Sequence, residues 1–299
     1  MIKVGCCGYP VSIIKYQENF HLIELNKTFY DYPKISTVVK WRENAPKGFE
    51  FAVKAHQDIS HKFKLNTESS ASTFGQMKQV CSLLAAKILL IQTPSSFRPD
   101  NLGDAEEFFD RMHRDDLILA WETRGSLWEQ KDAYQRLSKI LETVDVVHVT
   151  DPFKVMPAYT NAVAYFRLHG LGERMYDYQY SNKELQKLYE IAKSFEDKGK
   201  EVYVLFNNLA MFDDALRFRR YIKCGKLPSL TKAIGIESVK EVIEGIKFPT
   251  TKTSIFKAVG WKLVESEDGK QVRIDELLKD MPLKTYNSVD EVLQEVRFH

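Results

Sequence analysis

Apolar residues recur along the chain in short runs that are separated by longer amphipathic stretches. Eight runs rich in Val, Ile, Phe and Tyr predict strands over residues 2–7, 20–26, 49–56, 87–92, 117–122, 144–150, 163–169 and 201–207. Between most of them, apolar residues at three-to-four spacing predict helices over residues 68–85, 104–114, 128–141, 182–198 and 209–224. Strands that alternate with helices form parallel sheets covered by helices.

The number of strands decides between two architectures. Eight β/α units favour an irregular (β/α)₈ barrel of the TIM type, and an open doubly wound sheet is the alternative. Two intervals make the barrel irregular. Residues 8–19 are short for a helical crossover, and residues 151–162 contain Pro152 and Pro157. The fold class that we expect is therefore α/β, an irregular TIM-type barrel.

The strand–helix alternation stops after residue 224. Gly225, followed by Pro228, predicts the end of the last barrel helix. We expect two domains, a barrel over residues 1–224 and a small, mostly helical appendage over residues 225–299.

Local signals predict elements on both sides of this boundary. Ser181 and Glu184 have the spacing of a capping box at the start of the helix over 182–198. In the appendage we expect helices over 237–246 and 289–296, the latter capped by Ser288, and a hairpin formed by 261–264 and 271–274.

Composition narrows the class of protein without identifying a partner. The 299 residues carry 43 Lys and Arg against 41 Asp and Glu, and the appendage carries 12 residues of each sign. This balance of charge does not indicate nucleic acid or a membrane surface as a partner. No apolar run approaches the roughly 20 residues that a membrane helix needs. The N-terminus lacks the pattern of a signal peptide, and four cysteines do not form a disulfide framework. We expect a cytoplasmic protein.

Polar side chains gather at the carboxyl-terminal ends of the predicted strands. Residues two apart in a strand share a face, and by this rule six strands place polar residues at the same end. In TIM-type barrels the active site forms at this end. The alternative is that buried charges here only pair with one another. The polar residues at these strand ends are Glu24, Asn26, Lys54, His56, Gln92, Glu122, Arg124, Arg167, His169, Tyr203 and Asn207.

These residue types favour acid/base chemistry on a polar or anionic ligand. Lys54, Arg124 and Arg167 are cations suited to a phosphate or carboxylate. Glu24 and Glu122 are the candidate general acid and base, and His56 and His169 are expected to assist them. His61 could also transfer protons, and the amides of Asn26, Gln92 and Asn207 suit hydroxyl recognition. His148 has apolar neighbours and is interpreted as a satisfied core histidine. No ligand spacing indicates a metal site, so no cofactor is predicted. A divalent ion held by Glu24, His56, Glu122 and His169 stays open.

Several motifs together resemble the YecE-like family, domain of unknown function 72. The matching stretches are residues 24–30 (ELNKTFY), 51–56 with 59–61, 92–97, 122–124, 167–170, 176–181 and 206–208. The resemblance covers roughly residues 1–224 and implies a TIM-type barrel, but it supplies no reaction. From these stretches we add Tyr30, His61 and Tyr178 to the substrate-binding set.

The resemblance is incomplete at the N-terminus and weaker in the tail. Residues 5–9 read GCCGY, where members of the family usually have Ser-Gly-Trp. Cys6 and Cys7 at this strand end suit packing, and a reactive thiol is the alternative. The tail partly resembles a small helical module, domain of unknown function 2795, and its protein partner is undetermined.

Three functional hypotheses follow. The first is an enzyme of the hydrolase or isomerase/lyase type that acts on a small polar or anionic substrate, such as a sugar, sugar phosphate or nucleotide fragment. The second is a metal-dependent phosphoester hydrolase on nucleic acid. The third is a non-catalytic ligand-binding barrel whose tail docks a partner.

Overall fold

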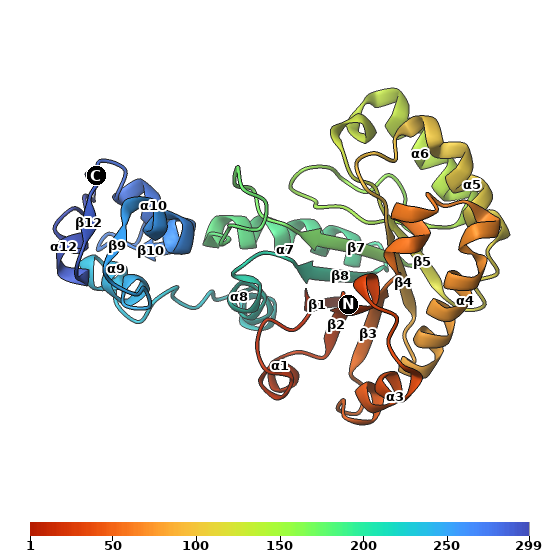
Figure 1. Cartoon of the computed structure of the whole chain (residues 1–299), viewed down its shortest axis with the longest axis horizontal. Coiled ribbons are helices and arrows are strands. Elements are labelled where there is room, and N and C mark those ends of the chain that lie inside the picture. The colour runs from red at the N-terminus through yellow and green to blue at the C-terminus, as the bar shows by residue number, and fades with distance from the viewer. Residues whose placement is uncertain (299) are drawn as a thin grey trace. The chain divides into compact units, whose positions relative to one another are not determined.

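The computed structural model of the protein, which describes residues 1–298, contains a sheet of eight parallel strands with helices around it (Figure 1). The strands pair in the order β6-β5-β4-β3-β2-β1-β8-β7, which confirms the predicted α/β barrel class. They are β1 (Ile2–Cys7), β2 (Leu22–Leu25), β3 (Glu50–Lys54), β4 (Ile88–Gln92), β5 (Ile118–Glu122), β6 (Val147–His148), β7 (Val163–Leu168) and β8 (Glu201–Phe206).

The barrel closes irregularly between β6 and β7. Strand β6 is only two residues long, and a single parallel bridge joins Thr150 to Phe166 of β7. The Arg167 amide donates to the Thr150 carbonyl at 2.9 Å. The two prolines of the 151–162 interval fit this short junction, because proline cannot donate to a strand ladder.

Helices α4 (Thr67–Leu84), α5 (Leu102–Arg111) and α6 (Lys131–Val144) lie outside the strands, where helices were predicted (Figure 1). Among residues 1–224, three helices were not predicted: α1 (Ile13–Asn19), α2 (Lys27–Tyr30) and α3 (Ile35–Glu43).

Tyr16 explains how the short α1 connection suffices between β1 and β2. Its fully buried hydroxyl accepts the Cys6 amide and donates to the Leu22 carbonyl, each at 2.8 Å. One side chain thereby joins the helix to both strands, and a longer crossover is not needed.

The chain divides into two compact units. The first comprises Met1–Leu168 and Glu190–Asn207, and the second comprises His169–Tyr189 and the residues from Asn208 onward. The loop after β7 and helix α8 (Met211–Cys224) therefore group with the tail. The domain boundary at residue 225 stays a prediction.

The second unit confirms several local predictions. Helix α7 (Asn182–Glu196) begins with the predicted capping box, in which Ser181 and Glu184 exchange hydrogen bonds. Helix α8 ends at Gly225, whose φ of +68° glycine adopts without strain. Ser288 caps α12 (Val289–Leu293) by accepting from the Glu291 amide.

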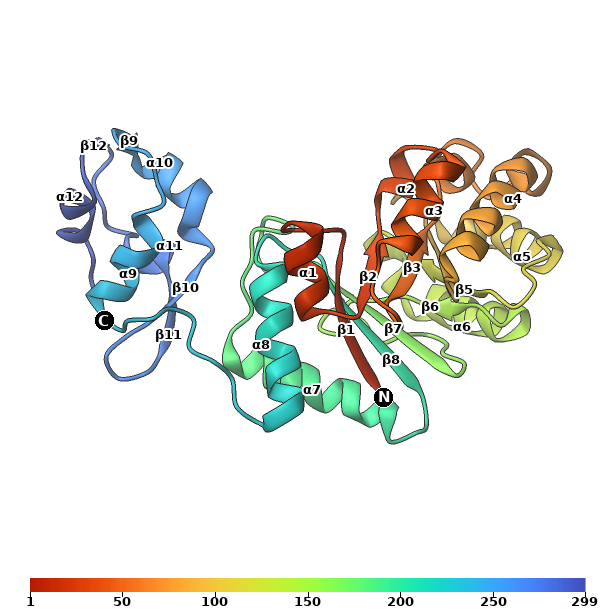
Figure 2. The same ribbon diagram turned by 90° about the horizontal axis from the view of Figure 1, so that it is seen from below.

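The tail has a hydrophobic core of its own, built by short elements (Figure 2). The predicted hairpin is β10 (Leu263–Glu265) paired with β11 (Gln271–Arg273), and a second pair joins β9 (Thr250–Thr251) to β12 (Thr285–Tyr286). Helices α9 (Ile236–Ile243), α10 (Lys252–Ile255) and α11 (Ile274–Leu277) complete it. Its fully buried members include Val239, Ile243, Ile255, Val264, Ile274 and Tyr286.

Candidate active site

Arg167 lies at the centre of a buried ionic cluster at the carboxyl-terminal end of the barrel. Its Nε and Nη2 donate to the two carboxylate oxygens of Glu24 at 3.0 and 2.8 Å, and its Nη1 bonds to Glu122. Tyr165, two residues earlier on β7, donates its hydroxyl to Glu24 at 2.8 Å. Burial lowers the pKa of Arg167, but Cys7 and both carboxylates outweigh burial and hold that pKa well above its ordinary value.

The two carboxylates of the cluster differ in their surroundings. Glu24 is fully buried, and it bonds to Arg167 and Tyr165 of β7 and to Cys7 of β1. Glu122 ends β5 and has a second arginine beside it, with Arg124 Nε 2.8 Å from Glu122 Oε1. The Arg124 side chain is 19% exposed, against 2% for Arg167. Glu122 is therefore the carboxylate that lies nearer to solvent.

Lys54 is the cation of this end that has no anionic partner. It ends β3, it is 6% exposed, and its Nζ lies 3.8 Å from the centre of the Phe29 ring. Among residues 1–298, no side chain or carbonyl accepts a hydrogen bond from its ammonium group or forms an ion pair with it. Burial lowers the pKa of Lys54 to about 8, and Arg167 acts in the same direction. A buried, unpaired ammonium is costly, so this position is poorly explained by stability alone.

Cys7 ends β1 beside the cluster and is almost fully buried. Burial raises the pKa of the Cys7 thiol well above its ordinary value, with Arg167 opposing and Glu24 reinforcing the shift. The thiolate is the nucleophilic form of cysteine. Cys7 is therefore a protonated packing group at neutral pH, in line with the packing interpretation of the sequence.

Two histidines follow β3 on the same side of the barrel. The His56 ring stacks on Tyr32 at 3.8 Å, and its Nδ1 accepts the Asp58 amide at 3.2 Å. His61 lies edge-on to Phe29 at 5.1 Å. Burial and the charge of Lys54 both lower the pKa of His61, so this ring is neutral at pH 7.

Comparison with known proteins agrees with this geometry. The sequence profile described as "Protein of unknown function DUF72" matches residues 11–229, which is most of the chain. The chain belongs to the DUF72 family. The sequence resemblance to this family is therefore confirmed, whereas the resemblance of the tail to a second module stays a prediction.

The relatives within the family carry no established reaction in their names. The chain is 23% identical to the UPF0759 protein YunF of Bacillus subtilis over 222 residues, which are 64% of this chain and 79% of that protein. It is 31% identical to the UPF0759 protein YecE of Escherichia coli over 103 residues, 34% and 37% of the two chains.

Solved DUF72 structures share the barrel. A DUF72 protein of Enterococcus faecalis aligns with a TM-score of 0.63 at 22% identity, over 75% of this chain and 98% of that one. A DUF72 protein of Thermotoga maritima aligns with a TM-score of 0.57 at 23% identity, over 75% and 99% of the two chains. At this level of identity the likeness shows the fold alone.

Tyr203 is a correction to the predicted site. Its hydroxyl bonds to Glu50 and accepts from Lys3 at 2.9 Å, and both partners lie at the amino-terminal ends of their strands. The prediction grouped Tyr203 with Asn207 because both share a face of β8. Four residues along a strand span about 13 Å, so one face reaches both ends of the barrel. Tyr203 belongs to a polar cluster at the opposite end.

Two predicted site residues lie in the second unit. Tyr178 donates its hydroxyl to Glu184 at 2.5 Å, and the Arg273 guanidinium lies 4.1 Å over its ring. His169 is 4% exposed and lies 5.9 Å from the ring of Tyr176. Their roles in a barrel site stay predictions.

The remaining predicted binding residues border the strand ends. Gln92 ends β4 in register with Glu122, and the Asn207 amide donates to the Leu168 carbonyl at 2.8 Å. Asn26 precedes α2, and Tyr30 at its end is 64% exposed. The contacts of these four side chains within residues 1–298 neither support nor oppose ligand binding, so their roles stay predictions.

Two members of the cluster were missed by the sequence interpretation. Tyr165 shares a face with Arg167, so the same two-residue rule could have found it. Phe29 lies within the family stretch 24–30, but only the structure shows that its ring covers Lys54.

No group of three or more His, Cys, Asp and Glu side chains among residues 1–298 is placed to hold a metal ion. Glu24 and Glu122, two of the proposed ligands, are both bonded to Arg167. The residues present therefore do not assemble the ligand set that the sequence left open.

His148 has a structural environment. It is 2% exposed, its Nδ1 accepts the Ala158 amide at 3.0 Å, and its Nε2 lies 3.3 Å from Thr123 Oγ1. Burial lowers the pKa of His148 to about 4, with Glu122 opposing the shift. The ring is neutral at pH 7, as expected of a satisfied core histidine.

This environment predicts a loss of stability in mild acid. Between pH 6.5 and 5 the unfolded chain completes the protonation of His148 but the folded chain does not, so the free energy of unfolding falls by about 1.6 kcal/mol. Urea unfolding at both pH values measures this loss. The variant His148→Gln should lack that part of the loss, and an equal loss in both proteins would contradict the assignment.

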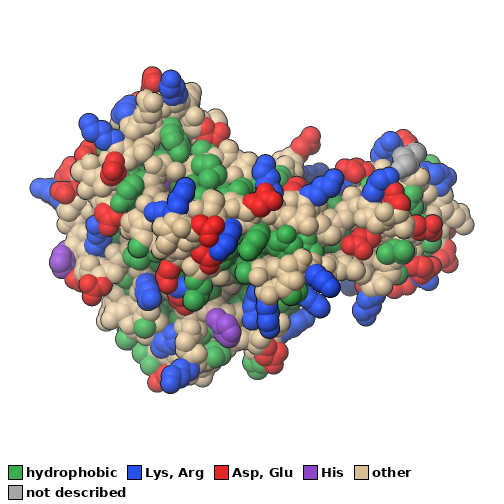
Figure 3. Space-filling model, turned by 180° about the vertical axis from the view of Figure 1, so that it is seen from behind, with side chains coloured by type: hydrophobic (Ala, Val, Ile, Leu, Met, Phe, Trp, Pro, Cys, Tyr) green, Lys and Arg blue, Asp and Glu red, His purple; other side chains and the backbone are tan. Residues whose placement is uncertain are grey.

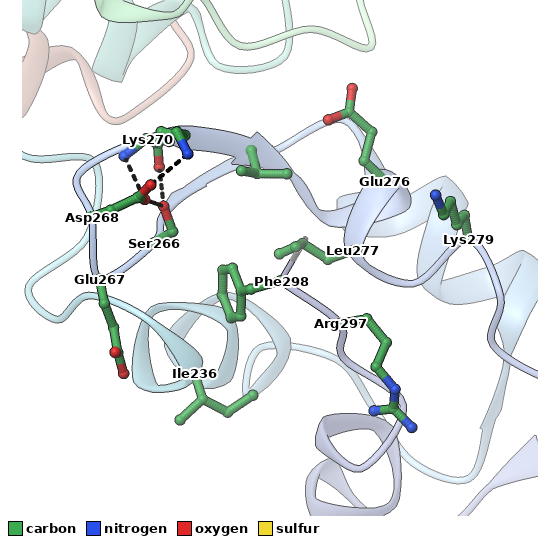
Figure 4. Close-up of a pocket in the computed structure, with 11 residues that line it drawn as sticks. Ile236, Ser266, Glu267, Asp268, Lys270, Glu276, Leu277, Lys279, Arg297 and Phe298 are labelled. Atoms are coloured by element: carbon green, nitrogen blue, oxygen red, sulfur yellow. Dashed lines mark hydrogen bonds and ion pairs between the residues drawn. The ribbon is translucent and has the colours of Figure 1, made fainter.

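A separate cavity of about 760 Å³ lies within the tail (Figure 4). Its apolar lining includes Ile236, Leu277 and Phe298, and Asp268 on its rim is paired with Lys270 at 2.6 Å. The lining also contains Glu267, Glu276, Lys279 and Arg297, but these four side chains are exposed, whereas Lys54 and the two carboxylates of the barrel end are buried. We therefore place the candidate active site in the barrel.

The surface and the helices add two general observations. On the face shown in Figure 3, Lys and Arg side chains are interspersed with Asp and Glu side chains over most of the surface, in keeping with the balanced composition. Among residues 1–298, no helix combines the length and the apolar character needed to span a membrane.

Proposed function

We propose that this DUF72 protein is an enzyme that uses acid/base chemistry on a small anionic substrate at the carboxyl-terminal end of its barrel. The observation that carries the proposal is Lys54, a buried cation that lacks an anionic partner among residues 1–298. Active sites of TIM-type barrels lie at this end, and a titratable group whose pKa is shifted by burial in such a place is a candidate functional residue.

The charge of the cluster supports an anionic ligand. Lys54, Arg124 and Arg167 supply three positive charges, whereas Glu24 and Glu122 supply two negative ones. Each carboxylate is held by arginine, so the excess charge resides at Lys54. A phosphate or carboxylate group of a substrate would neutralise it through a charge-assisted hydrogen bond.

The two carboxylates suit different roles. Glu24 is fully buried and accepts three hydrogen bonds from Arg167 and Tyr165, which fits a positioning residue. Glu122 lies nearer to solvent beside Arg124, which fits the general acid or base. His56 and His61 follow β3, and the charge of Lys54 acts on the His61 ring, so these two histidines are the candidates to assist in proton transfer.

Phosphate binding tests the proposal directly. Isothermal titration calorimetry at pH 7 should detect saturable binding of inorganic phosphate to the full chain. Replacing Lys54 by methionine should weaken this binding at least tenfold, about 1.4 kcal/mol, because the unpaired charge is removed.

The matched control is Lys62→Met. Lys62 is exposed and also lies over an aromatic ring, 5.0 Å from the centre of Phe63, but it is outside the cluster. Its replacement should leave phosphate binding unchanged. Absence of phosphate binding to the unmodified protein, or equal losses in the two variants, would count against an anionic substrate.

A further inference from the structure

The setting of Lys54 differs from that of a lysine that only holds an anion. Its Nζ lies over the Phe29 ring at 3.8 Å and the side chain is 6% exposed, in a barrel end that also contains a carboxylate suited to proton transfer. An amine that is shielded from water and free of acceptors is easily deprotonated, and the neutral amine is a nucleophile.

We propose that Lys54 is a covalent nucleophile that forms an imine with the carbonyl carbon of a small anionic aldehyde or ketone. This inference rests on the proposed function, because it assigns a substrate class and a covalent step to the same barrel-end site.

The step is balanced without any co-reactant. The neutral Lys54 amine adds to the carbonyl carbon, the carbonyl oxygen takes up a proton, and the nitrogen gives one up. The resulting carbinolamine loses its oxygen as water, which leaves a carbon–nitrogen double bond. We assign the delivery and removal of these protons to Glu122, because its charge acts on Lys54 and it is the less enclosed carboxylate of the cluster.

The charged groups around Lys54 decide how much of its amine is neutral. Burial is the main influence on the pKa of Lys54, and Arg167 adds to it, whereas the acidic neighbours oppose both. At a pKa of about 8, about a tenth of the amine is neutral at pH 7, against fewer than about one in a thousand for an ordinary lysine. The neighbouring titratable groups are Arg167 of β7, Glu24 of β2, Glu122 of β5, Cys7 of β1 and His61 after β3.

Other groups of the cluster are less suited to this role. Arg124 and Arg167 stay protonated at any pH that the protein survives. Burial keeps the Cys7 thiol protonated. Lys54 is thus the nucleophile that the barrel end offers among these cluster residues.

Reductive trapping with glyoxylate tests the inference. Glyoxylate is an anionic aldehyde small enough to reach a side chain with little exposure, and cyanoborohydride reduces its imine to carboxymethyl-lysine. Peptide mass mapping of the full chain then locates the modified lysines. At pH 7 we expect Lys54 to be modified at least tenfold faster than Lys62, because far more of its amine is neutral.

The pH dependence and two variants sharpen the test. The rate at Lys54 should rise through about pH 8 and then level, whereas the rate at exposed lysines should keep rising toward about pH 10. Lys62→Arg should leave the rate at Lys54 unchanged. Lys54→Arg should show no new fast-reacting lysine. The wild-type comparison of Lys54 with Lys62 stands even where a variant fails to fold.

Each outcome separates the inference from the proposed function. Modification of Lys54 no faster than Lys62 would overturn the imine, and phosphate binding would still be judged by calorimetry. Fast modification that saturating phosphate suppresses would support both. Fast modification in a protein that binds no phosphate would support the imine and would overturn the phosphate binding on which the proposed function is tested.

Discussion

Replacing Lys54 by methionine is expected to raise the free energy of unfolding by about 2 kcal/mol at pH 7 while it weakens phosphate binding at least tenfold. Burial lowers the pKa of Lys54 from 10.5 to about 8, which corresponds to about 3 kcal/mol of destabilisation when the amine is protonated. The contact with the Phe29 ring offsets about 1 kcal/mol of this cost. Methionine has a similar length and requires no buried charge.

The sign of the pH dependence follows from the lowered pKa. Between about pH 8 and 10.5 the unfolded chain keeps the Lys54 proton and the folded chain loses it, so stability rises with pH in this window. The gain in the free energy of unfolding of Lys54→Met over the wild type should therefore be largest below pH 8 and should vanish near pH 10.5. Urea unfolding of both proteins across this range measures the difference, in which the titrating groups remote from Lys54 cancel.

Lys62→Met is the control for this measurement. Lys62 is exposed, so its replacement should change the free energy of unfolding by less than about 0.5 kcal/mol at any pH. A Lys54→Met protein that is less stable than the wild type at pH 7 would show that Lys54 has a stabilising partner, and it would remove the main support for a functional role.

Replacing the neighbouring Arg167 by methionine is expected to have the opposite effect. Arg167 donates to Glu24 twice and bonds to Glu122, and its removal leaves two buried carboxylates without their main partner. Breaking a buried ion pair in this way typically costs about 3–5 kcal/mol. Urea or thermal unfolding at pH 7 should show this loss.

Two further variants identify the cause. Arg124→Met removes the more exposed arginine beside Glu122 and should cost about 1 kcal/mol or less. The double variant Glu24→Gln/Arg167→Met should recover part of the loss, because one of the orphaned charges is gone. A loss below about 1 kcal/mol for Arg167→Met alone would contradict the central position of Arg167.

The two predictions separate a functional cation from a structural one within the same cluster. Functional sites often carry groups that stability would not select, and their removal then stabilises the fold. Lys54 fits this pattern, whereas Arg167 fits that of a residue that organises its neighbours. Unfolding experiments on Lys54→Met and Arg167→Met therefore distinguish a cation that binds a ligand from an arginine that stabilises the cluster.

Much of the architecture was determined by the sequence alone. The short apolar runs predicted the eight strands, which the barrel buries on both faces, and apolar residues at three-to-four spacing predicted the helices α4 to α6, which each bury one face. The cap formed by Ser181 and Glu184 and the glycine stop at Gly225 depend on neighbouring residues only, so they too were predictable. The strand-end rule also brought Glu24, Lys54, Glu122 and Arg167 to one end of the barrel.

Only the tertiary structure decided what each of these side chains does. Which cation pairs with which carboxylate depends on contacts between β2, β5 and β7, which are far apart in the sequence. The same contacts leave Lys54 over Phe29 without an anion, although its residue type and position resemble those of Arg167. Tyr203 is the clearest example of what the sequence could not predict. Strand periodicity specifies the face on which a side chain lies, but it does not specify how far along the barrel axis that side chain lies. Long-range pairing and depth are properties of the closed barrel, and no local pattern encodes them.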